Sequence, residues 1–138
     1  MTANTHWTSK YVGMRVIPGV FDCATLAEQV QREVFNKVVN IPSEKPTDEA
    51  GVLAKFHARQ EQIASTKDTL CERTNSPREG DAVLMQSRGY RQHIGTLVYL
   101  NNDVWVLHTD DRAKQVVLQR AREMPMRGLM IEGYYRWK

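Results

Sequence analysis

The sequence has few cysteines and no long apolar run, and each of these features excludes a class of protein. No stretch approaches the roughly 18 consecutive apolar residues of a membrane-spanning helix, so we expect no membrane insertion. Two cysteines, Cys23 and Cys71, are too few for a small disulfide-stabilised domain, and both are expected to be thiols. Residues 1–10 lack the charged start and apolar core of a secretory signal, which predicts synthesis in the cytoplasm without a signal peptide.

The chain also lacks a block of basic residues. Its 19 Lys and Arg residues exceed its 16 Asp and Glu residues, but they are dispersed along the sequence. A dispersed pattern does not follow a phosphate backbone, so no nucleic-acid partner is expected. With 41% hydrophobic and 25% charged residues, the composition is that of a globular protein. Because domains hold roughly 100 to 200 residues, residues 1–138 are expected to form a single domain.

The spacing of apolar residues is helical in the first half of the chain and alternating in the second. Residues 22–35 place apolar side chains on one stripe, with Asp22 as N-cap and Cys23 opening the helix. A second helix is predicted for residues 47–66. Strands are predicted for residues 81–86, 93–100, 103–109, 116–118 and 128–137, with Asn101-Asn102 as a hairpin turn and a loop around Met124-Pro125. Helices followed by strands predict the α+β class.

The predicted hairpin brings two histidines together. If Asn101-Asn102 form a two-residue turn, Leu100 faces Asp103 and His108 lies opposite Gly95. His93 precedes Gly95 by two residues, so His93 and His108 project from one face as diagonal neighbours, about 7 to 8 Å apart at the backbone. Gly95 has no side chain to stand between the two rings. A slip of one residue in register would put the rings on opposite faces.

Cys23 is the candidate nucleophile, because a helix N-terminus and a nearby imidazolium both stabilise a thiolate. A cysteine on an apolar stripe is more commonly a small core residue, and a strand histidine is more commonly an ordinary hydrogen-bonded side chain. Cys71 has neither a helix start nor a histidine beside it in the sequence, so a structural role is expected for it. His6 and His57 are interpreted as structural or solvated.

Five segments taken in order resemble a known family. They are Trp7…Tyr11-Val12-Gly13, Asp22-Cys23-Ala24-Thr25, Gly80-Asp81, His93-Ile94-Gly95 and Val106-Leu107-His108. This order is similar to that of the NlpC-type cell-wall cysteine peptidases, and within them to the branch found in phage tails and prophages. The sequence departs from the family in the short segment of residues 13–21, which has no tyrosine before Asp22.

The resemblance implies a papain-like fold, with N-terminal helices and the nucleophile at a helix start packed on a C-terminal antiparallel sheet. It also implies a cysteine endopeptidase in which Cys23 is the nucleophile, His93 the base and His108 the orienting residue, with no metal or cofactor. The implied substrates are peptidoglycan stem peptides, cut between γ-D-glutamate and a diamino acid. The implied setting is a virion tail, a released lysin or an injected effector, with other phage tail proteins as possible partners.

Three further interpretations of the residues stay open. Asp22, Arg15, Arg88 and Arg91 are weak candidates for holding substrate, since they flank the motifs and the arginines suit carboxylates. The chain is alternatively a phage tail assembly module with the same fold and weak or no catalysis. A zinc hydrolase using Cys23, His93 and His108 as ligands is chemically allowed.

Overall fold

The computed structural model describes residues 6–17, 20–41, 69–87 and 91–138. Its helical elements are the 3-10 helices η1 (Trp7–Lys10) and η3 (Ala121–Arg127) and the α-helix α1 (Cys23–Val34). The strands are β1 (Cys71–Thr74), β2 (Ala82–Ser87), β3 (Arg91–Leu100), β4 (Asp103–Asp110), β5 (Gln115–Arg120) and β6 (Leu129–Trp137). The α+β class is therefore confirmed, and each of the five predicted strands matches an observed strand to within a few residues at its ends.

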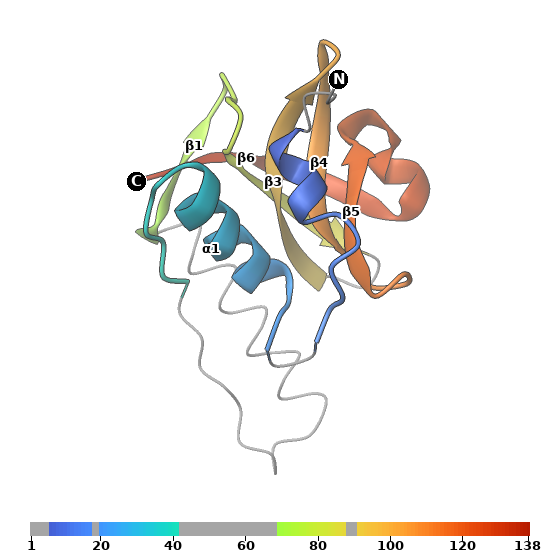
Figure 1. The fold of residues 1–138 in the computed structure, drawn as a ribbon. Helices are drawn as coiled ribbons and strands as arrows, with labels where there is room; N and C mark the ends of the chain where they lie inside the picture. Colours follow the sequence, from blue (N-terminus) through green and yellow to red (C-terminus); the bar gives the residue numbers. More distant parts are fainter. Residues whose placement is uncertain (1–5, 18–19, 42–68, 88–90) are drawn as a thin grey trace, which may run out of the picture.

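The six strands form one antiparallel sheet in the order β1-β6-β2-β3-β4-β5 (Figure 1). Helix α1 packs across one face, where its buried side chains meet those of β2, β3 and β4 and of η1. Met124 of η3 packs with Val83, Leu97 and Val106 on the other face. Helical elements thus cover both faces of the sheet.

The predicted start of α1 is confirmed, and its cause is a side-chain cap. Asp22 has extended backbone and its Oδ1 accepts hydrogen bonds from the amides of Ala24 and Thr25, at 3.0 and 3.1 Å. The Thr25 hydroxyl accepts in turn from the Asp22 amide, which completes a capping box. Cys23 is fixed as the first residue of the helix.

The predicted hairpin register is also confirmed. Asn101 and Asn102 have φ angles of 52° and 60°, the left-handed pair that a two-residue hairpin turn requires. Leu100 pairs with Asp103, and the same register continues to Thr96 and Leu107.

One strand was not predicted, and one local prediction is wrong. Residues 71–74 form the edge strand β1 against β6, although only Cys71 among them is buried, so the segment carries no alternating apolar pattern. The expected loop around Met124-Pro125 is the 3-10 helix η3, which is held by burial of Met124. The predicted helix of residues 47–66 lies outside the described residues.

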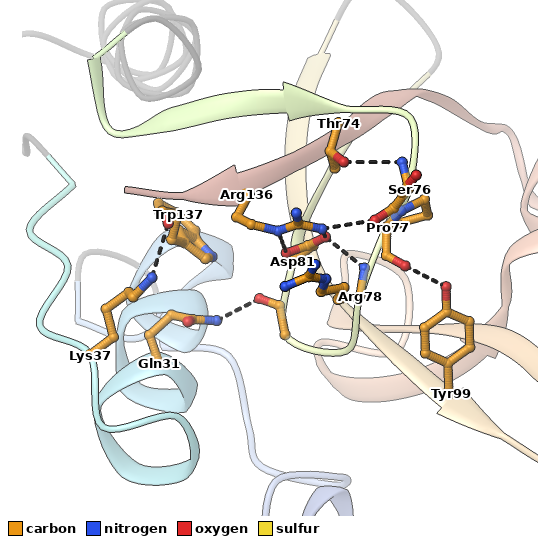
Figure 2. Close-up of polar contacts among 11 residues, drawn as sticks. Gln31, Lys37, Thr74, Ser76, Pro77, Arg78, Asp81, Tyr99, Arg136 and Trp137 are labelled. Carbon is orange, nitrogen blue, oxygen red and sulfur yellow. Dashed lines mark hydrogen bonds and ion pairs between the residues drawn. The ribbon is translucent and has the colours of Figure 1, made fainter.

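The Gly80-Asp81 motif connects α1 to the sheet (Figure 2). The buried Asp81 carboxylate accepts two hydrogen bonds from Arg136 of β6, at 3.2 and 3.0 Å, and a third from the Arg78 amide at 2.7 Å. The carbonyl of Gly80 accepts a hydrogen bond from the side chain of Gln31 of α1 at 2.8 Å. In this structure the motif therefore positions α1 relative to β2 and β6.

Candidate functional site

His93 and His108 form a buried hydrogen-bonded pair. His93 Nε2 lies 3.0 Å from His108 Nδ1, the ring centroids are 5.1 Å apart, and the ring planes cross at 83°. The pairing of β3 with β4 runs from Leu100 and Asp103 to Thr96 and Leu107, and the two histidines lie just beyond its end. The contact predicted from the hairpin register is confirmed.

His108 has a second partner on the next strand. Its Nε2 lies 2.8 Å from Oε1 of Gln119 on β5. An amide oxygen only accepts, so this contact is a hydrogen bond when neutral His108 carries its ring proton on Nε2, a tautomer that leaves Nδ1 as an acceptor. His93 Nε2 then donates to His108, and Nδ1 of His93 becomes the nitrogen that is able to take a proton.

The environment keeps His108 uncharged near neutral pH. His108 is 1% exposed. Burial, together with the nearby His93 imidazole, lowers the pKa of His108 from 6.5 to about 4, against smaller opposing effects of Gln119, Thr109 and Asp110. A neutral His108 suits the acceptor role toward His93, because it does not add a second positive charge to the pair.

Gly95 is needed for the packing of neighbouring strands. A Cβ at Gly95 would lie 2.5 Å from Val106 Cγ1, 3.1 Å from Met85 Cε and 3.1 Å from the carbonyl oxygen of Leu107. The space is thus closed by a valine methyl group of β4 and a methionine of β2. These neighbours alone leave no room for a side chain here, and the expectation that Gly95 keeps the space between the two rings open stays a prediction.

Cys23 lies at the helix N-terminus but inside the apolar core. Its side chain is 3% exposed and packs in a cluster that includes Ile94, the residue after His93. Side chains alternate along β3, so Ile94 faces α1 while His93 pairs with Met85, which belongs to the cluster on the other face. Cys23 and the histidine pair therefore lie at the same end of β3. The thiol packs against Ile94 on one face, and the imidazoles lie on the opposite face.

The second cysteine has the same exposure but begins a strand rather than a helix. Cys71 is also 3% exposed and belongs to the same apolar cluster, and neither cysteine forms a disulfide. Burial raises the pKa of the Cys71 thiol to about 12. It begins an edge strand rather than a helix, so no helix dipole favours its thiolate.

The weaker candidates come from different parts of the chain. The carboxylate of Asp22 caps α1, and Arg15 is exposed beside the start of β5, where it bridges to Gln115. The backbone of Arg91 opens β3, and Arg88 lies outside the described residues. A substrate-binding role for these four residues therefore stays a prediction.

Tyr11, an aromatic residue of the first of the five segments, contacts the C-terminal end of α1. Tyr11 is fully buried, and its hydroxyl donates to Glu33 at 2.7 Å. Glu33 follows Cys23 by ten residues, about 15 Å along the helix at 1.5 Å per residue. Tyr11 therefore anchors η1 to the end of α1 and does not belong to the site.

A pocket of about 250 Å³ lies beside α1, away from the histidines. It is lined by Phe21, by the helix residues Thr25, Glu28 and Arg32, and by residues 38–40. Thr25 is two residues after Cys23, which corresponds to about 200° of rotation around the helix. Because the buried face of Cys23 points elsewhere, we give this pocket no catalytic role.

Gln119 was not among the residues predicted for the site. A four-residue turn between Asp110 and Gln115 pairs β4 with β5 so that Val106 lies opposite Gln119. Gln119 is then a diagonal neighbour of His108, by the same geometry that joins His93 to His108. Applying the hairpin argument to this second turn would have found it.

The described residues contain no group of three or more His, Cys, Asp or Glu side chains arranged to hold a metal ion. The facing nitrogens of His93 and His108 are at hydrogen-bond distance, which is the geometry of a proton donor and acceptor. The zinc interpretation of Cys23, His93 and His108 is therefore not supported.

Within the same described ranges, no helix has the length and apolar character needed to cross a membrane.

Comparisons of the chain with protein-family models, with characterised proteins and with solved structures find no match.

Proposed function

We propose that the protein is a cysteine endopeptidase that hydrolyses peptidoglycan stem peptides, as its motif order suggests. The observation that carries the proposal is the buried contact between His93 and His108, together with the contact of His108 with Gln119. These contacts orient the His93 imidazole and stabilise its protonated form during the reaction. The capped N-terminus of α1 at Cys23 adds a dipole that favours a thiolate.

The reaction assigns one step to each group. The proposal requires the Cys23 thiol to reach His93 around the end of β3, because the two side chains lie on opposite faces of that strand. His93 then takes the proton of the thiol, and the thiolate attacks the peptide carbonyl carbon, with the oxyanion facing the Cys23 amide. The amides of Ala24 and Thr25 donate to Asp22 and are not assigned to the oxyanion. The C–N bond breaks as His93 gives its proton to the leaving amine, and water then hydrolyses the thioester and restores the thiol.

A second candidate is an assembly module of a phage tail with little or no catalysis. The burial of Cys23 in an apolar cluster favours it, because structural buried cysteines are poor nucleophiles. The two candidates differ in whether the thiol of Cys23 reacts in the folded protein.

Thiol labelling separates these candidates with an internal control. Cys23 and Cys71 have the same exposed fraction, so a difference in labelling rate reports thiolate character rather than access. We expect a small electrophile at pH 7 to modify Cys23 at least tenfold faster than Cys71 in the native fold. Equal and slow labelling of both would favour the assembly module.

Hydrolysis is tested with stem-peptide fragments and mass spectrometry of the products. We expect Cys23→Ala and His93→Gln to abolish turnover and Cys71→Ala to keep it, because only the first two residues take part in bond breaking. His108→Asn should lose less activity than His108→Ala, since an amide keeps a hydrogen-bond partner for His93. Turnover retained by Cys23→Ala would overturn the mechanism.

A further inference from the structure

We propose that Gln119 is a positioning residue that selects the ring tautomer of His108 and thereby decides which nitrogen of His93 accepts a proton. Its catalytic consequence rests on the proposed peptidase function. The proposal itself rests on three distances around one imidazole, which connect β3, β4 and β5.

Two acceptors compete for the single N–H of neutral His108. The carbonyl oxygen of Thr109 lies 3.2 Å from Nδ1, and Oε1 of Gln119 lies 2.8 Å from Nε2. Neutral imidazole carries one proton, so only one of these oxygens is able to receive it. The shorter contact favours the Nε2–H tautomer.

The choice of tautomer controls the contact with His93. With the proton on Nε2, His108 Nδ1 has a lone pair that accepts from His93 Nε2 across 3.0 Å. With the proton on Nδ1, that nitrogen would donate, and His93 Nε2 would have to be the acceptor. Nδ1 of His93 would then carry the hydrogen and lose its ability to take the thiol proton.

The structure holds Gln119 in place for this role. Its backbone pairs with Val106 in the β4 and β5 ladder, and its side chain is half-buried. His108 is almost fully buried, so water competes poorly for its Nε2–H. Loss of the Gln119 oxygen would leave the Thr109 carbonyl as the better acceptor and reverse the tautomer.

The test reads the tautomer directly, by ¹⁵N chemical shifts of the imidazole nitrogens at pH 7. We expect His108 of the native protein to carry its proton on Nε2. In Gln119→Leu the proton should move to Nδ1, while Gln119→Glu, which keeps an acceptor oxygen, should retain it on Nε2. Gln115→Leu, a change of the same type on the same strand, should leave the His108 signals unmoved.

Kinetics on stem-peptide fragments give the second readout. Gln119→Leu should lower kcat by about 10- to 100-fold with KM unchanged, because Gln119 acts through His108 and not through contact with substrate. Gln119→Glu should recover most of that loss, and Gln115→Leu should resemble the native protein.

The outcomes separate this inference from the proposed function. A native His108 with its proton on Nδ1 overturns the role of Gln119 without any variant being needed. An unchanged tautomer in a folded Gln119→Leu protein also overturns it. A native protein that shows no turnover overturns the proposed function, while the tautomer measurement still confirms or refutes the assignment of Gln119.

Discussion

Burial of His108 should make the protein lose stability as the pH falls. The unfolded chain binds a proton at His108 with a pKa near 6.5, whereas in the folded protein the pKa is lowered to about 4. Between these values the unfolded state holds more protons, so acidification favours unfolding. Linkage gives a loss of about 2 kcal/mol between pH 7 and pH 5, and no further contribution from this group below its folded pKa.

Urea denaturation at several pH values measures this loss. The matched variant is His108→Asn, which keeps hydrogen-bonding groups and does not titrate in this range. Other groups contribute to both proteins, so the informative quantity is the difference between the two curves, which includes the coupling of His108 to His93. The native protein should lose about 2 kcal/mol more than the variant over pH 7 to 5. Parallel curves would refute the assignment of His108 as a buried neutral imidazole.

Three further predictions concern the scaffold, and urea midpoints measure each of them. Asp81→Asn should cost about 2 kcal/mol because it breaks a two-point ion pair with a buried carboxylate; an unchanged midpoint would contradict its anchoring role. Gly95→Ala should cost about 1 to 3 kcal/mol, because the added methyl group clashes with Val106. Val106→Ala removes that clash, so the double variant should lose less stability than the sum of the two single variants. Asn102→Val should cost about 1 kcal/mol and Asn102→Gly almost nothing, because φ is 60° there; equal effects would exclude a left-handed turn.

The amino-acid sequence by itself determined the features that depend on neighbouring residues. Asp22 and Thr25 are three residues apart and cap the helix between themselves, so the position of Cys23 at its start followed from local chemistry. Asn101-Asn102 fixed the turn, and the period of two along both strands then placed His93 and His108 on one face.

Only the tertiary structure decided the features that depend on distant segments. The edge strand β1 is polar along most of its length and is a strand because β6 offers it a pairing edge. Gln119 joins the histidines through a second hairpin, and the burial of Cys23 depends on β2, β3 and β6 packing against α1. Caps and turns are satisfied within a few residues, whereas burial and cross-strand partners exist only once separate segments meet in space.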